Sequence, residues 1–144
     1  MARTPISELM TPNPITIAYR ETVGKAMEMM ARHDIRRLPV IKDGKLVGIV
    51  SDRDLRQMGG RPSVKLPESD RDKAYLQLPV EEAMTLNVIT IRERQSVQDA
   101  IALMVKHKIS GLPVLDSDRA LVGMLSEQDV LTYCLSILER ESDR

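Results

Sequence analysis

The chain has 144 residues, enough for one ordinary domain or for two small domains that share a core. Its 21 Lys and Arg residues balance its 21 Asp and Glu residues, which argues against nucleic acid or an anionic membrane surface as a partner. Its only aromatic residues are three tyrosines and it has a single cysteine, which excludes an internal disulfide and a cysteine-based zinc site and argues against base stacking on aromatic side chains.

Membrane insertion and export are not expected either. No apolar run approaches the roughly 20 residues that a membrane-spanning helix needs. The N-terminal Met-Ala-Arg-Thr-Pro is not followed by the apolar core of a signal peptide. The sequence therefore predicts a cytoplasmic protein.

The sequence repeats itself. Residues 6–41 align with residues 80–115, and the register resumes at Leu46 and Leu121 after one inserted residue. Such a register predicts two copies of one structural unit. We place repeat 1 at residues 6–58, a linker at 59–79 and repeat 2 at 80–138.

The sequence of each repeat predicts the same secondary-structure elements in the same order. A helical turn (residues 7–10 and 81–84) precedes a short β-rich run (15–17 and 88–91). A helix with one apolar face follows, capped at Thr22 and at Ser96. Two further strands form a hairpin, around Asp43-Gly44 in repeat 1 and around a longer turn at 116–119 in repeat 2.

The second hairpin is followed by the last helix, which continues to Leu138 ahead of a charged tail. Pro39, in the first hairpin strand, suggests an edge strand or an interrupted ladder. The order β-α-β-β-α predicts an α+β fold. Because three strands cannot cover their own apolar face, the two repeats are expected to pack together as a pseudo-twofold pair.

The segment between the repeats is rich in Gly, Pro and charge, which is typical of a linker, and a helical turn is expected around residues 70–75. Residues 59–63, Gly-Gly-Arg-Pro-Ser, could instead form a phosphate-binding loop. They follow no uncommitted strand and lack the Walker lysine, so the linker interpretation is preferred.

Each hairpin ends in the same motif, a glycine followed by Ser51 and Asp54 in repeat 1 and by Ser126 and Asp129 in repeat 2. Two interpretations are open. A serine with an acid three residues later is a common helix cap. Alternatively, a carboxylate accepts hydrogen bonds from two ribose hydroxyls, and a serine hydroxyl with free N–H groups at a helix start suits an anion.

The repeated unit, with its Leu-Pro-Val strand (residues 38–40 and 112–114) and its Gly-x-x-Ser-x-x-Asp motif, resembles the CBS domain, named for cystathionine β-synthase. Two such units in tandem resemble a CBS pair, or Bateman module, and the layout is similar to stand-alone prokaryotic CBS-pair proteins. The resemblance implies that AMP, ADP, ATP or S-adenosylmethionine binds as an effector in clefts between the repeats. It also implies a homodimer, joined through helix faces, that regulates another protein.

The resemblance further implies the residues of each cleft. In the first cleft Asp54 would bind the ribose, Ser51 the phosphate, and Ile49 would lie against the base. The other residues of this cleft would be Thr85 and Thr90 from the opposite repeat, with Arg36, Arg37 and Arg53 at the phosphate end. The second cleft would be formed by Asp129, Ser126 and Met124, by Gln128 and Ser110 at the polar end, and by Thr11 and Thr16 from repeat 1.

The two clefts differ in charge. Arg36, Arg37 and Arg53 stand where repeat 2 has Ser110, Gly111 and Gln128. We therefore expect the Asp54 cleft to prefer polyanionic nucleotides and the Asp129 cleft a less charged adenosyl compound.

No catalytic or metal-binding constellation is recognised, and the two histidines are expected at helix C-termini or on the surface. The sequence thus predicts a non-enzymatic regulatory sensor. The alternative is a structural dimerisation module with no nucleotide ligand.

Overall fold

The chain forms two compact units, and these do not coincide with the two repeats. In the computed structural model, which describes residues 3–59 and 74–143, the inner unit is the continuous stretch Ile15–Val88 and the outer unit combines Met1–Pro14 with Ile89–Arg144. Each repeat therefore gives its first residues to the unit that holds the rest of the other repeat. We call residues 3–14 and 74–88 the lead-in segments. The phosphate loop considered above, apart from Gly59, and most of the turn expected at 70–75 lie outside the described residues.

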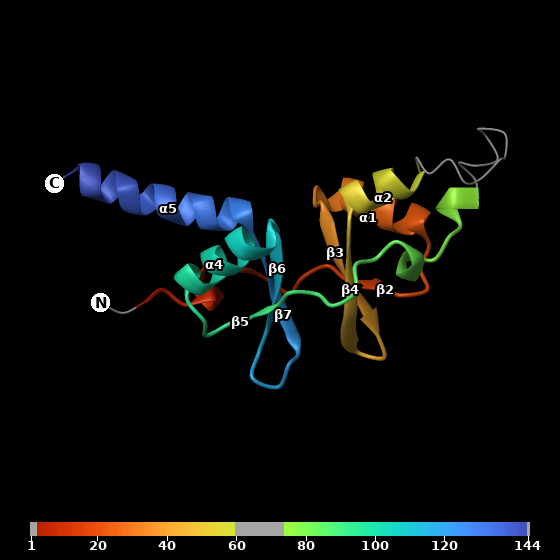
Figure 1. Ribbon diagram of the computed structural model, residues 1–144, viewed down its shortest axis with the longest axis horizontal. Coiled ribbons are helices and arrows are strands. Elements are labelled where there is room, and N and C mark those ends of the chain that lie inside the picture. Colours follow the sequence, from red (N-terminus) through yellow and green to blue (C-terminus); the bar gives the residue numbers. More distant parts are fainter. Residues whose placement is uncertain (1–2, 60–73, 144) are drawn as a thin grey trace. The chain divides into compact units, whose positions relative to one another are not determined.

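The inner unit packs two helices on one face of a three-stranded sheet (Figure 1). Strand β2 (Ile17–Ala18) runs parallel to the central strand β3 (Arg37–Lys42), which pairs antiparallel with β4 (Lys45–Ser51). Helix α1 (Val23–His33) connects β2 to β3, and α2 (Asp52–Gly59) follows β4 directly. The 3₁₀ helix η2 (Val80–Glu82) comes from the second lead-in segment.

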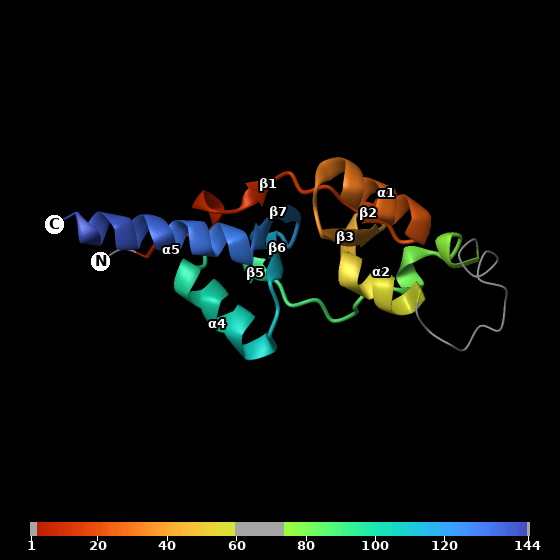
Figure 2. The ribbon, with the colours of Figure 1, turned by 90° about the horizontal axis from the view of Figure 1, so that it is seen from above.

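The outer unit has the same plan with a longer last helix. Its sheet has the order β1-β7-β6-β5, in which the strands are β1 (Thr11–Pro12), β5 (Ile91–Arg92), β6 (Gly111–Leu115) and β7 (Leu121–Ser126). Helices α4 (Val97–His107) and α5 (Glu127–Ser142) lie side by side on one face of this sheet (Figures 1 and 2). The 3₁₀ helix η1 (Ile6–Glu8) belongs to the first lead-in segment.

Two expectations for the outer unit are wrong. Its sheet has four strands rather than three, because the first lead-in segment adds β1 alongside β7. The C-terminal residues expected to form a charged tail are helical as far as Ser142. Their charged side chains are exposed on the helix surface, so the charge does not end the helix. Among the described residues, no helix has both the length and the apolar character that crossing a bilayer requires.

The lead-in segments are integral parts of the two cores. Val80 and Ile6 occupy matching places and are each fully buried. In the inner unit the backbone N–H of Val80 donates to Glu21 O and that of Val23 to Leu78 O, both at 2.8 Å. In the outer unit Ile6 N–H donates to Gln95 O at 2.8 Å. Each core is therefore complete only with residues from the other repeat.

Pro39 lies in the central strand of its sheet, so the edge-strand interpretation is wrong. Its partner across the hairpin is Ile49, whose own N–H and C=O bond to Thr85 on the far side. The pair Pro39–Ile49 consequently exchanges no hydrogen bonds, and the donor that proline lacks would point towards β2. Strand β2 reaches only Val40 and Ile41, so no ladder bond is lost. The ladder is irregular just beyond this point, with a register shift between Val40 and Ile41.

The hairpin turns agree with the sequence expectation. Asp43 and Gly44 both have positive φ, 51° and 77°, as a two-residue type I′ turn requires. In the outer unit the Oδ1 atom of Asp116 accepts hydrogen bonds from the backbone of Asp118 and Ala120, which organises the longer turn.

Candidate functional site

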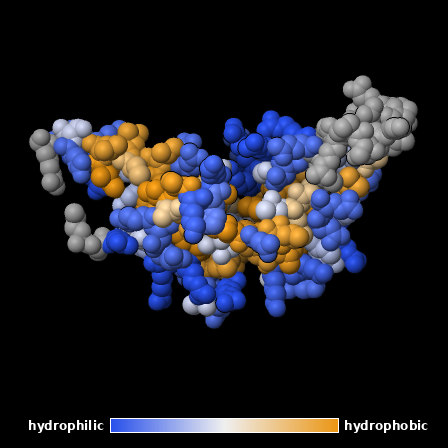
Figure 3. Space-filling model, in the orientation of Figure 1, coloured by the Kyte–Doolittle hydropathy of each residue, from blue (hydrophilic) through white to orange (hydrophobic). Residues whose placement is uncertain are grey.

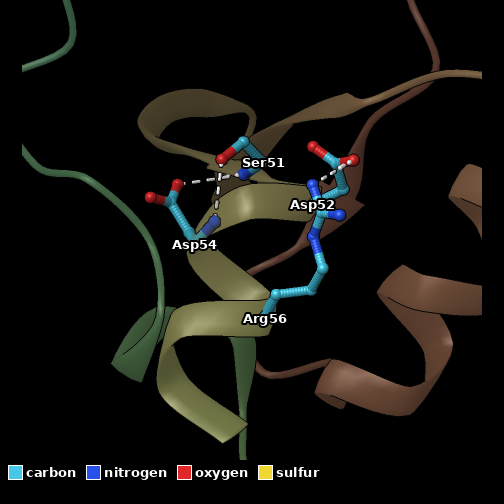
Figure 4. A network of polar contacts seen from close by, with 4 residues as sticks. All are labelled: Ser51, Asp52, Asp54 and Arg56. Atoms are coloured by element: carbon cyan, nitrogen blue, oxygen red, sulfur yellow. Dashed lines mark hydrogen bonds and ion pairs between the residues drawn. The ribbon is translucent and has the colours of Figure 1, made fainter. Parts of the chain in front are cut away.

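The Ser–Asp motif forms a reciprocal helix cap in both repeats. At the start of α2 the Asp54 N–H donates to Ser51 Oγ, while Ser51 N–H donates to Asp54 Oδ2, both at 3.0 Å (Figure 4). At the start of α5 the same two bonds join Ser126 and Asp129 at 3.1 and 2.9 Å. The capping interpretation of the motif is therefore confirmed.

A third reciprocal cap, or capping box, shows that the Ser–Asp motif alone does not indicate a ligand site. Ser96 and Asp99 at the start of α4 make the same pair of bonds, at 3.2 and 3.0 Å. The hydrogen bonds from Ser96 hold the pKa of Asp99 below its usual value. No binding role was expected there, so a ligand site at the other two boxes needs support from their surroundings.

The box leaves part of each carboxylate available. It engages Oδ2 of Asp54 and of Asp129, whereas their Oδ1 atoms accept no hydrogen bond from the described residues. Both side chains are half-buried. A carboxylate has about four acceptor positions on its two oxygens, so capping the helix and accepting a hydroxyl from a ligand are compatible at the same residue.

Each motif lies beside a lead-in segment that belongs to the other repeat. In the inner unit Thr85 and Ile49 exchange two backbone hydrogen bonds, Thr85 N–H to Ile49 O at 2.8 Å and Ile49 N–H to Thr85 O at 3.2 Å. In the outer unit Thr11 pairs with Met124 in the β1–β7 ladder. The side chains of Thr85 and Thr11 are exposed.

The glycine of each motif makes this crossing possible. A Cβ atom at Gly48 would lie 3.0 Å from the carbonyl oxygen of Thr85 and 2.9 Å from Met84 Cγ. At Gly123 the same atom would lie 3.0 Å from Thr11 O and 3.0 Å from Met10 Cγ. The sequence analysis gives these two methionines no role in the site. The same methionine and the same glycine recur in both repeats, which was a signal that they contact each other.

The arginines expected at the phosphate end sit at the same end of the inner sheet as the Ser51–Asp54 box. Arg37 is in register with Ser51 on the neighbouring strand, and the carbonyl of Arg36 accepts from Asp52 N–H at 2.9 Å. Arg53 is exposed on the first turn of α2. In the outer unit Gly111 is in register with Ser126, and Ser110 O accepts from Glu127 N–H at 2.8 Å.

The remaining expected residues are distributed as follows. Gln128 is exposed on the first turn of α5, next to Asp129. Thr16 and Thr90 precede β2 and β5, which are shorter than expected and begin at Ile17 and Ile91. Thr90 falls in the outer unit and Asp54 in the inner one, and the reverse holds for Thr16 and Asp129. The roles of these two threonines stay predictions.

Metal-binding chemistry finds no support in the described ranges. They contain no group of three or more His, Cys, Asp or Glu side chains that could hold a metal ion. His33 and His107 are the last residues of α1 and α4 and are exposed, as expected from the sequence.

The chain belongs to the CBS domain family, whose profile matches residues 6–59 and 80–136. A CBS domain-containing protein of Dictyostelium discoideum is 36% identical over 137 residues, which make up 93% of this chain and 93% of that protein. The chain spans only 21–23% of several other curated relatives, which are inosine-5′-monophosphate dehydrogenases and a homoserine O-acetyltransferase.

Two solved structures are similar over almost their whole length. The structure of CBSX2 in complex with AMP has a TM-score of 0.73 and 29% identity, covering 92% of this chain and 97% of that one. The CBS domain pair of protein MJ0100, in complex with 5′-methylthioadenosine and S-adenosyl-L-methionine, has a TM-score of 0.77 and 29% identity and covers 94% and 98%. The fold is thus that of a CBS pair.

Proposed function

We propose that this CBS pair is a non-enzymatic cytoplasmic sensor that binds adenosine-containing ligands: AMP, ADP, ATP or S-adenosylmethionine. The observation that carries the proposal is the half-buried carboxylate of each Ser–Asp box, which retains an acceptor oxygen beside a lead-in segment of the other repeat. One similar structure holds AMP, and another holds 5′-methylthioadenosine and S-adenosyl-L-methionine. Ligand binding would act on a regulated protein by favouring one of two conformations of the pair.

The two sites are proposed to differ in the ligand charge they accept. Among residues 36, 37 and 51–56 the inner unit has four arginines against two aspartates, a net charge of +2. The matching residues 110, 111 and 126–131 have Glu127 and Asp129 and no cation, a net charge of −2. Arg56 lies 3.3 Å from Asp52 and offsets its charge (Figure 4). The inner site therefore suits a polyphosphate, and the outer site a less charged adenosyl compound.

Calorimetric titration of ATP, AMP and S-adenosylmethionine tests both claims. We expect Asp54→Ala to weaken ATP binding by about 10-fold or more, since a bond to a charged group is lost. Asp129→Ala is expected to spare ATP and to weaken the less charged ligand. Asp99→Ala is the matched control, because it removes the same capping bond from α4 and should leave both affinities unchanged.

Two results would overturn these assignments. Loss of ATP binding in Asp129→Ala alone would reverse the proposed charge preference. No heat and no thermal shift with any of the three ligands at millimolar concentration would refute the sensor proposal and leave the structural dimerisation module as the better explanation.

A second proposal, self-association into a homodimer, is supported by the surface of α5. Leu131, Leu135 and Leu138 follow one another at helical spacing and are 55–60% exposed. Figure 3 shows apolar surface over α5. The inner unit has Arg56 at the position that matches Leu131. A row of exposed leucines on a helix is typical of a face that a second copy covers.

Sedimentation of a Leu135→Glu variant tests this proposal. We expect wild type to sediment as a dimer at micromolar concentration and the variant as a folded monomer, because a charge in the middle of the row must be desolvated on association. Gln57→Glu, on the exposed surface of α2, is the control and should stay dimeric. A monomeric wild type would refute the proposal.

A further inference from the structure

Helix α2, which carries Asp54 at the inner site, is short. It has eight residues, Asp52–Gly59, a length that is not stable on its own in water. Among residues 52–57, whose side chains the structure describes, Leu55 is the buried one, 2% exposed. The ion pair between Asp52 and Arg56 is exposed and contributes little. The Ser51–Asp54 cap fixes the start of α2. The direction of the helix then depends on the contacts made by the residues in its middle.

Tyr75 holds the middle of α2 from the lead-in segment. Its hydroxyl donates to the backbone carbonyl of Leu55, the residue next to Asp54, and its ring packs against the inner core. A peptide carbonyl has two lone pairs, so this bond can coexist with the helical one. A tyrosine hydroxyl is protonated at neutral pH, and hence a donor, and burial raises the pKa of Tyr75 further.

The segment that carries Tyr75 is itself anchored to α1. Val23 N–H donates to Leu78 O at 2.8 Å, and Thr22 forms a bridge with Pro79. Gly24 allows a close approach: a Cβ there would lie 3.2 Å from Leu76 O. Tyr75 thus joins α2 to a segment that is fixed at its other end to the first helix.

The outer unit has a matching link that matters less to its helix. There the Tyr133 hydroxyl, on α5, is bonded at 2.6 Å to the Thr4 hydroxyl of the other lead-in segment. Helix α5 has 16 residues, and Val130, Tyr133 and Cys134 all contact the outer core. Removing one hydroxyl leaves most of what positions α5, whereas the bond from Tyr75 is made to the middle of a helix half as long.

We propose that Tyr75 is a positioning residue of the inner site: its hydroxyl fixes α2, and with it Asp54, and so makes ligand affinity depend on the second lead-in segment. This inference rests on the proposed function. Tyr75 does not need to contact the ligand. A displacement of the second lead-in segment would reach the ligand through Tyr75, α2 and Asp54.

Three variants separate positioning from general stability. Tyr75→Phe removes the hydroxyl and keeps the ring. Tyr133→Phe makes the same change in the outer unit. Leu78→Ala removes half-buried core packing from the same lead-in segment while leaving the Tyr75 bond and the Leu78 carbonyl in place. ATP affinity is measured by calorimetry well below the unfolding temperature of every variant, and amide hydrogen exchange of residues 52–57 is measured without ligand.

We expect Tyr75→Phe to weaken ATP binding by about 3- to 10-fold, the usual range for one hydrogen bond, and to speed exchange in α2. Tyr133→Phe should leave the ATP affinity unchanged, and Leu78→Ala should lower the unfolding temperature but not the affinity. Unchanged ATP affinity in Tyr75→Phe, or an equal loss in Leu78→Ala, would overturn the inference alone. A wild type that binds no ATP would overturn the proposed function as well, so the two failures are distinguishable.

Discussion

A fragment of residues 15–88 is expected to fold on its own, whereas a fragment of residues 6–58, which is repeat 1 as the sequence defines it, is not. The first fragment contains the whole inner core, including Val80, and both helices and all three strands of the sheet. The second fragment lacks Val80, Tyr75 and Leu78 and carries Ile6, whose buried place is in the outer unit.

The size of the effect follows from how little stability a domain of this length has. About 70 residues give roughly 4–11 kcal/mol of unfolding free energy. Burying a valine side chain contributes about 1.5–3 kcal/mol, and the missing segment also supplies the Tyr75 and Leu78 contacts and two backbone bonds to Ile49. Losing all of these removes most or all of the margin.

Circular dichroism melting and amide proton dispersion in solution spectra check this prediction, with sedimentation at the same concentration to identify monomers. The 15–88 fragment should melt cooperatively as a monomer. A Val80→Asp change within it serves as the control and should abolish the transition. Cooperative melting of monomeric 6–58 would show that the lead-in segment is dispensable, contrary to the contacts of Val80.

The internal repeat explains both what could be predicted and what could not. The order of elements, the N-caps at Thr22 and Ser96 and the Asp43-Gly44 turn follow from local patterns, and the structure has them. The exchange of lead-in segments does not follow from such patterns. Ile6 and Val80 are equivalent positions of the repeat. Each would have to be apolar whether it packed in the core of its own repeat or in that of the other, so the sequence pattern cannot distinguish the two arrangements. Only the resemblance to CBS domains implied that Thr85 joins the Ser51–Asp54 motif of the other repeat, and its pairing with Ile49 is seen only in the structure.

Pro39 and Asp54 show two further limits of the sequence. The missing donor of Pro39 suggested an edge strand, but whether a central strand can spare a donor depends on where its parallel neighbour β2 begins, which is a property of the sheet. The spacing of Ser51 and Asp54 fits both a cap and a ligand site because both need a carboxylate at the helix start. The cap can be seen in the bonds of the box, while ligand binding requires a measurement.

Replacing the motif glycines is the second change with a large expected effect. Gly48→Ala and Gly123→Ala should each lower the unfolding free energy by about 1–3 kcal/mol, the usual cost of overpacking. At both positions the added Cβ would meet a backbone carbonyl oxygen at 3.0 Å, which cannot rotate away as a side chain can. Displacing Thr85 would also disturb the strand that holds Ile49, so Gly48→Ala is expected to weaken ATP binding.

A double-mutant cycle with Met84 separates the two contacts at Gly48. In a Met84→Ala background the side-chain clash disappears and the clash with Thr85 O stays, so the cost of Gly48→Ala should fall without vanishing. Gly24→Ala is a comparison with a milder clash: its Cβ would lie 3.2 Å from Leu76 O, still a tight contact, and the preference of a helix for alanine over glycine, up to about 1 kcal/mol, offsets part of the cost. Denaturant unfolding measures every variant. If Gly48→Ala were as stable as wild type, the segment around Thr85 would have moved to accommodate a methyl group. The close approach of the two segments would then not explain the glycine of the motif.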